Sequence, residues 1–158
     1  LDFLNEPLAL FNPEDSHKAE GYRALKERVD RADVFLLGTP DYHGTMSSAL
    51  KNFLDHFWTE FAGRLFVPIV GSYDKGLTVT DQLRTVARQV YAWAMPYAIA
   101  YADKEDLRDG QIVSDAFRKR FEMAVRDIRV YGALLNQQRA ADLSGAEPGF
   151  MARYRPRA

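Results

Sequence analysis

Two short apolar runs constrain the fold of this chain more than any other feature of its sequence. Residues 34–39 read VFLLGT and residues 65–71 read LFVPIVG, and neither run alternates with polar residues. Continuous apolar strands are typical of a parallel sheet buried on both faces, so we expect both runs to be such strands. Pro68 inside the second run is compatible with a strand where the ladder does not require its missing N–H.

Helical periodicity surrounds these runs. In four segments apolar residues recur three and four positions apart, which predicts amphipathic helices: 17–31, 48–61, 80–91 and 113–135. We expect a third strand over 95–102. Strands that alternate with helices indicate a doubly wound parallel sheet between two helical layers, a three-layer α/β/α fold. We expect one domain over 1–135 and an extended or disordered C-terminal arm over 136–158.

Composition excludes several classes of protein. The chain has 158 residues and a net charge of −1, which indicates neither a second domain nor a nucleic-acid-binding surface. It has no cysteine, and His17, His43 and His56 are not spaced as metal ligands, so we expect no metal site. No apolar stretch reaches the roughly 18 residues of a membrane span, which favours a cytoplasmic protein without a membrane partner. The chain begins at Leu1 rather than Met, and we expect that an N-terminal segment is missing from it.

The candidate site lies in two loops. In an open parallel sheet ligands bind outside the carboxyl ends of the strands, and residues 39–45 and 71–76 follow the two apolar runs. Their glycines allow close backbone approach, while Tyr42 and Tyr73 offer flat faces with a polar tip. The helix that begins near Ser47 directs its free N–H groups toward the same edge.

Several of these sequence features also have a purely structural explanation. Pro40 and Gly44 also suit an ordinary strand-to-helix turn, and Ser47 or Ser48 suits a helix N-cap. Lys51 and Asp55 are spaced as an exposed ion pair. The aromatic residues of the 48–61 helix suit a core, and part of their wide face also suits contact with another subunit.

The order of residues after the first run resembles a known family. Pro40-Asp41-Tyr42-His43-Gly44 followed by Leu50-Lys51-Asn52-Phe53-Leu54-Asp55 is similar to the loop and helix of the NADPH-dependent FMN reductase family, whose fold is flavodoxin-like. The resemblance extends over about 8–135, and the C-terminal tail loosely resembles the arsenical-resistance flavoprotein branch.

This resemblance implies an FMN-dependent enzyme. Hydride would pass from NADPH or NADH through FMN to a quinone, free flavin or other small oxidant, without a dedicated catalytic side chain. A homodimer or homotetramer would form through the 48–61 helix. The cofactor-binding residues would be Thr39, Pro40, Asp41, Tyr42, His43, Gly44, Thr45, Gly71, Ser72, Tyr73, Lys75 and Gly76.

Three departures from the family pattern leave alternatives open. Asp41 replaces the usual Glu, His43 replaces the usual Asn, and the second loop contains fewer glycines. The family's first strand and its Gly-Ser-x-Arg-type phosphate loop have no counterpart in this chain, so we expect exposed strand edges. A flavodoxin-type electron carrier and a non-catalytic flavodoxin-like protein therefore stand as alternatives to the reductase.

Overall fold

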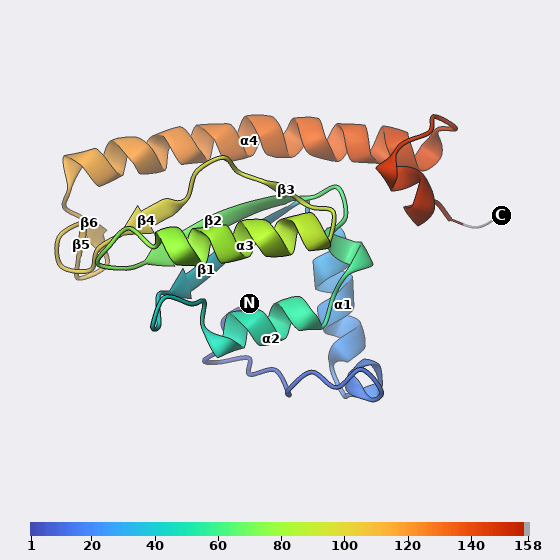
Figure 1. Ribbon diagram of the computed structural model, residues 1–158, viewed down its shortest axis with the longest axis horizontal. Coiled ribbons are helices and arrows are strands. Elements are labelled where there is room, and N and C mark those ends of the chain that lie inside the picture. The colour runs from blue at the N-terminus through green and yellow to red at the C-terminus, as the bar shows by residue number, and fades with distance from the viewer. Residues whose placement is uncertain (157–158) are drawn as a thin grey trace.

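A parallel sheet lies at the centre of the computed structural model, which describes residues 1–156 (Figure 1). β1 (Val34–Pro40) pairs along its whole length with β2 (Leu65–Gly71). β3 (Trp93–Ala94) and β4 (Ile99–Tyr101) follow one another along the other side of β2. Among residues 1–156 no strand pairs with the second edge of β1.

The third strand is interrupted, whereas the sequence predicted one strand over 95–102. The chain bends at Pro96 and Tyr97, between β3 and β4. Proline has no N–H for a ladder, which accounts for the break. Pro68 of β2 pairs with Leu37 on one side and has no partner in β3 or β4 on the other. Pro68 of β2 therefore lies beside the gap between β3 and β4.

Helices cover both faces of the sheet, which confirms the predicted α/β architecture (Figure 1). Phe35, Phe66 and Val70 pack on one face against the three helices that precede residue 90. Leu65 and Val67 pack on the other face against the long C-terminal helix. The helices are α1 (Tyr22–Arg31), α2 (Ser48–Asp55), α3 (Leu77–Gln89) and α4 (Asp115–Ser144), with 3-10 turns η1 (Ser16–Lys18), η2 (Thr59–Phe61) and η3 (Phe150–Tyr154) and a hairpin of β5 (Leu107–Arg108) and β6 (Gln111–Ile112).

β1 is buried on one face only, contrary to the prediction for the 34–39 run. Phe35 and Leu37 are buried, but Leu36 on the opposite face is 56% exposed. The reason is the position of α4, which reaches β1 where Gly132 meets Val34. A Cβ atom on Gly132 would lie 2.7 Å from Cγ2 of Val34, so glycine permits this close approach.

The aromatic segment after the first loop is not one long helix. α2 ends at Asp55, and the chain turns through η2 instead of continuing to Phe61. The turn directs Phe57 and Phe61 into the core of this chain, where Phe61 packs edge-on against Phe35 with ring centroids 4.9 Å apart. Of the segment's large aromatic side chains only Trp58 is exposed.

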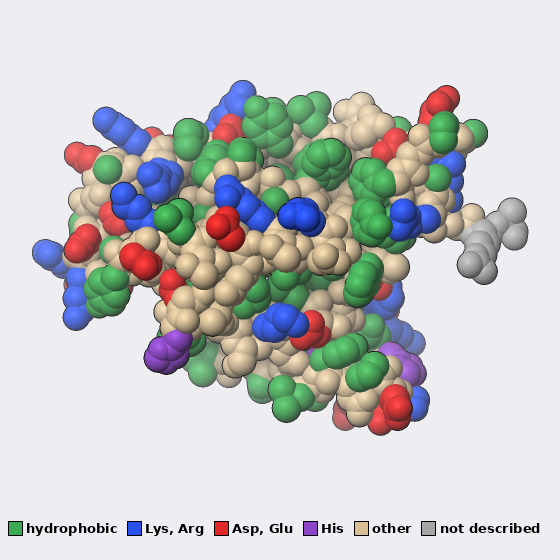
Figure 2. All heavy atoms as spheres, in the orientation of Figure 1, with side chains coloured by type: hydrophobic (Ala, Val, Ile, Leu, Met, Phe, Trp, Pro, Cys, Tyr) green, Lys and Arg blue, Asp and Glu red, His purple; other side chains and the backbone are tan. Residues whose placement is uncertain are grey.

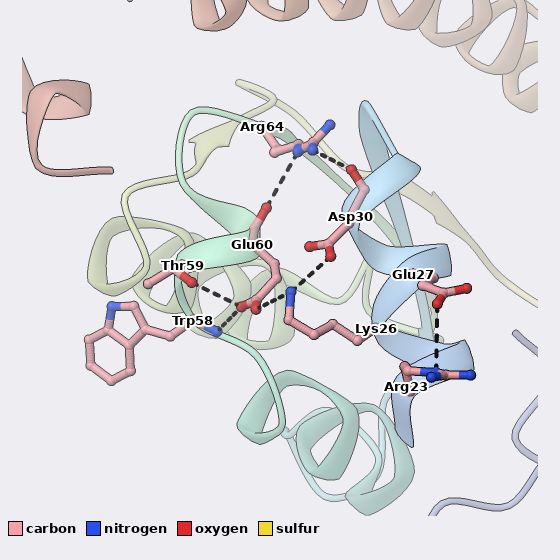
Figure 3. A network of polar contacts seen from close by, with 8 residues as sticks. All are labelled: Arg23, Lys26, Glu27, Asp30, Trp58, Thr59, Glu60 and Arg64. Carbon is pink, nitrogen blue, oxygen red and sulfur yellow. Dashed lines mark hydrogen bonds and ion pairs between the residues drawn. The ribbon is translucent and has the colours of Figure 1, made fainter. Parts of the chain in front are cut away.

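Polar contacts hold the η2 turn against α1 (Figure 3). Lys26 Nζ lies 2.8 Å from an Asp30 carboxylate oxygen and 3.2 Å from Glu60 Oε1. Arg64 donates to the carbonyl oxygen of Asp30 at 2.6 Å and is almost fully buried. Burial, together with the nearby charge of Arg139, lowers the pKa of Arg64. Backbone carbonyls and carboxylates thus surround a cation that would otherwise be costly to bury.

The C-terminal part of the chain also differs from the prediction. α4 continues nine residues beyond Leu135, to Ser144, and η3 follows instead of an extended or disordered arm. Met151 of η3 is buried, and Arg155 Nε donates to the carbonyl oxygen of Asp142 at 2.8 Å. These contacts fold the described residues of the arm, up to 156, against the end of α4. Residues 157–158 lie outside the described part.

Candidate functional site

Asp41 joins the two candidate loops at the carboxyl ends of β1 and β2. Its backbone N–H donates to the carbonyl oxygen of Gly71 at 2.8 Å. Its side chain accepts the Gly44 N–H at 2.8 Å and contacts the Ser72 hydroxyl at 3.3 Å. One carboxylate therefore contacts both its own loop and the loop that follows β2.

The first loop is a tight reverse turn. Tyr42 and Thr45 exchange backbone hydrogen bonds of 3.0 and 3.1 Å, and the two residues between them have positive φ angles, 56° for His43 and 76° for Gly44. Two consecutive left-handed residues are the requirement of a type I′ turn. The Gln82 side chain from α3 then donates to the Gly44 carbonyl oxygen at 3.0 Å, which links the turn to that helix.

α2 begins at the end of this loop. The Ser47 hydroxyl accepts the Leu50 N–H at 3.3 Å, so of the two predicted N-cap candidates, Ser47 and Ser48, Ser47 is the cap. The buried Thr39 hydroxyl in turn accepts the Ser47 N–H at 2.8 Å. Thr39 thus sets the angle between strand and helix, and its hydroxyl is directed inside the fold.

The second loop is shaped by Ser72 and Gly76. The Ser72 hydroxyl donates to Asp74 at 2.6 Å, and this bond lowers the pKa of the Asp74 carboxyl. Lys75 and Gly76 have φ angles of 67° and 59°. A Cβ atom on Gly76 would lie 2.4 Å from Cγ1 of Val70, so this position excludes any side chain.

A pocket of about 720 Å³ lies between the two loops and the β5–β6 hairpin. The loops and the hairpin are at the end of the sheet where β1, β2 and β4 terminate (Figure 1). Six of the predicted binding residues line it: Pro40, Asp41, Gly44, Gly71, Ser72 and Tyr73. Tyr42 and Thr45 line a neighbouring pocket of about 920 Å³ between α2 and α3. Thr39, His43, Lys75 and Gly76 line neither pocket.

The pocket contains residues that the sequence analysis missed. Asp109 and Gly110 form the turn of the hairpin, with φ angles of 50° and 74°. Asp-Gly is a known hairpin signal, so this wall was readable from the sequence. Tyr101 ends β4 and Asp103 follows it, and the position of this strand at the same edge is a weaker signal. Gln82 lines the neighbouring pocket and was not among the predicted binding residues.

The charged side chains that line the pocket are all acidic. Asp41, Asp74, Asp103 and Asp109 line it, and none of its lining residues in the described part of the chain is Lys or Arg. Elsewhere, on the face shown in Figure 2, acidic and basic side chains are interspersed. The backbone N–H groups of His43 and Tyr73 donate to no group within residues 1–156. Of these two residues only Tyr73 lines the pocket. Its free N–H group can donate to a polar edge atom of a bound heterocycle.

A parallel sheet with helices on both faces places the chain among the doubly wound α/β proteins. The comparisons make this more specific. The family model for NADPH-dependent FMN reductase matches residues 1–106. The chain therefore belongs to the NADPH-dependent FMN reductase family, and the predicted enzyme class, an FMN-dependent NAD(P)H oxidoreductase, is confirmed at the level of the family.

Two curated relatives carry related names. An NADPH azoreductase from Bacillus sp. (strain OY1-2) is 31% identical over 134 residues, which cover 82% of this chain and 74% of the relative. An FMN-dependent NADPH-azoreductase from Staphylococcus haemolyticus (strain JCSC1435) is 34% identical over 111 residues, which cover 66% of this chain and 58% of the relative. The chain thus matches only part of the length of these relatives.

Solved structures agree on the fold. An apo NADH:FMN oxidoreductase is similar with a TM-score of 0.60 at 22% identity, covering 77% of this chain and 67% of that one. An oxidoreductase from Corynebacterium diphtheriae is similar with a TM-score of 0.57 at 18% identity, covering 75% of this chain and 62% of that one. The flavodoxin-like fold is confirmed. Within residues 1–156 no helix is long and apolar enough to cross a membrane.

Proposed function

We propose that this chain transfers hydride from NAD(P)H through FMN to a small planar oxidant such as a quinone, a free flavin or an azo compound. The observation that carries the proposal is the Asp41 link, because it shapes one pocket from the two loops in a chain of this family. Azo compounds are included because two relatives are named azoreductases.

The pocket residues have defined roles in this proposal. The free N–H group of Tyr73 would bind a polar atom of the flavin ring, and the Tyr73 side chain would flank the ring. Tyr42 would face the neighbouring pocket, and His43 would act by shaping the first loop. FMN would supply the hydride chemistry. The chain would hold FMN in position and keep competing ligands out of the pocket. Lys75, Gly76 and Thr39 would act by shaping the loops, since none of them lines the pocket.

Anaerobic spectroscopy tests this function. The chain is mixed with FMN, freed of excess flavin, and its visible spectrum is recorded before and after NADPH is added. We expect retained yellow colour that bleaches with NADPH. Colour that persists would indicate the electron carrier instead, and a colourless protein would show that this chain does not hold FMN. Repeating the titration with NADH determines which nucleotide is preferred.

We also infer that the chain acts as a cytoplasmic homodimer or homotetramer with the 48–61 segment at the contact. Fewer aromatic residues are available for this contact than the sequence suggested, because Phe53, Phe57 and Phe61 are buried within this chain. Trp58, which is 58% exposed, would make the contact. Analytical ultracentrifugation at micromolar concentration should show an oligomer that Trp58→Glu weakens. A monomeric wild-type protein would contradict the inference.

A further inference from the structure

Tyr101 lies at the end of β4, and its side chain turns back over the end of β2. The Ser72 N–H donates to the Tyr101 carbonyl oxygen at 2.9 Å. A Cβ atom on Gly71 would lie 2.9 Å from the Tyr101 hydroxyl oxygen and 3.0 Å from Cζ. Since the backbone of Gly71 is not in the left-handed region, the glycine serves to leave room for the phenol.

The Tyr101 hydroxyl is held in position but has no hydrogen-bond partner within residues 1–156. Within residues 1–156 no hydrogen bond reaches it, whereas the Tyr97 hydroxyl donates to Asp127 at 2.7 Å. Every side-chain oxygen that is closed off from solvent within residues 1–156 has a hydrogen-bond partner. Because the Tyr101 hydroxyl has no such partner there, it must be open to solvent. Its ring packs beside Phe117, with centroids 6.1 Å apart, and it lines the candidate pocket.

The aspartates, Ser72 and Tyr73 of the pocket are less suited than Tyr101 to give a proton to a bound ligand. Ionised aspartates accept hydrogen bonds and do not donate them. The Ser72 hydroxyl is already engaged by Asp74 at 2.6 Å. The Tyr73 side chain is 85% exposed and therefore not held in one position. Tyr101 combines a phenolic proton, a packed ring and a free hydroxyl.

We propose that Tyr101 is a catalytic residue that donates a hydrogen bond, and then a proton, to the oxygen of a quinone in this pocket; this rests on the function proposed above. FMN, when bound, would supply the quinone with two electrons and one hydrogen that originate from NAD(P)H. The Tyr101 O–H bond breaks as a new O–H bond forms on the quinone oxygen, which gives the hydroquinone. Water then returns a proton to the phenolate. A positioned general acid of this kind contributes about 10²-fold or more to a rate.

Two oxidants with different proton requirements test the assignment. NADPH reduces FMN-loaded wild type and Tyr101→Phe without oxygen, and each reduced protein is then mixed with menadione or ferricyanide in a stopped-flow instrument. Menadione takes up protons and ferricyanide takes only an electron. We expect Tyr101→Phe to lose about 10²-fold in the menadione rate, with the rates for NADPH and ferricyanide unchanged. Tyr97→Phe, which removes a hydroxyl outside the pocket, should keep the wild-type ratio of the two oxidants.

Binding provides a readout that does not depend on turnover. The affinity of the oxidised protein for menadione should fall about 3- to 10-fold in Tyr101→Phe, as expected for one lost hydrogen bond. The stability of this variant should be unchanged, because no hydrogen bond within the protein is lost. Equal slowing of both oxidants, or unchanged menadione rate and affinity, would overturn the role of Tyr101. A wild-type protein that NADPH does not reduce would overturn the reductase, while the binding comparison would still test Tyr101.

Discussion

At the scale of single residues, Asp41 does the most to shape the candidate site. Its carboxylate accepts the Gly44 N–H and contacts the Ser72 hydroxyl, so it lies at the junction of two loops that are 31 residues apart in the chain. A charge-assisted bond to a backbone N–H is among the stronger hydrogen bonds of a protein. The position of both loops should therefore depend on this one side chain.

Asp41→Ala should separate the two loops. We expect the free energy of unfolding to fall by about 1–2 kcal/mol and the FMN dissociation constant to rise by roughly 10-fold, measured by urea unfolding and by flavin fluorescence. Glu27→Ala is the control, since Glu27 forms only an exposed contact with Arg23 on α1. Unchanged flavin affinity in Asp41→Ala would show that the loop link does not shape the binding site.

His56 should make stability depend on pH. Burial lowers its pKa, and the charge of Asp55 only partly opposes this effect. The unfolded chain, with an ordinary histidine pKa of about 6.5, then binds a proton more readily than the folded chain. Stability is therefore full above pH 6.5 and is lost as the pH falls from 6.5 through the lowered pKa.

Urea unfolding between pH 5 and 8 measures this slope. We expect His56→Gln to flatten it, and His17→Gln to leave it unchanged because His17 is exposed. An equal slope in wild type and His56→Gln would refute the assignment.

At the scale of elements, α4 approaches β1 closely at Gly132. Gly132 lies against Val34 with room for no side chain, whereas alanine is intrinsically better than glycine in a helix by about 1 kcal/mol. The tertiary contact and the helix propensity thus favour different residues at position 132.

Gly132→Ala should reveal which effect is larger. We expect a net loss of about 1–2 kcal/mol in the free energy of unfolding, because overpacking exceeds the gain in helix propensity. A second variant, Gly132→Ala with Val34→Ala, should show a positive coupling between the two sites in a double-mutant cycle. Gly149→Ala is a suitable control, since a Cβ atom there meets nothing within 4 Å. Additive effects at 132 and 34 would contradict the contact.

At the scale of the whole molecule, the C-terminal segment forms part of the folded structure. Met151 of η3 is 1% exposed, and a Cβ atom on Gly63 would lie 3.0 Å from its sulfur. Gly63 precedes β2, so η3 packs against the start of a central strand. Arg139 from α4 reaches the same place, donating to the Ala62 carbonyl oxygen at 2.9 Å.

Met151→Ala should therefore lower global stability although it lies far from the candidate site. We expect a loss of about 2–4 kcal/mol, measured by urea unfolding. Met123→Ala removes the same atoms from a side chain that is 48% exposed, and its effect should be much smaller. Equal effects of the two substitutions would show that the η3 contact contributes little.

Local sequence signals predicted the positions of β1 and β2 and of the loops that follow them. The first apolar run became β1 with one further residue, and the second became β2 with the same ends. Ser47 caps its helix as its position indicated. Helix ends were predicted less well, because η2 and η3 are held by contacts with distant residues. The Asp-Gly turn of the hairpin is a sequence signal that hydrophobic periodicity does not detect.

The sequence by itself determined the order of strands and helices, the composition of the two loops and the family to which the chain belongs. These properties depend on residues within a few positions of one another, where periodicity, turn chemistry and capping act. Only the tertiary structure decided that Asp41 meets Ser72, that Gln82 supports the first loop and that Tyr101 reaches the pocket. Those contacts join residues some 30 to 60 positions apart, and they form because the parallel sheet brings the carboxyl ends of its strands to one edge.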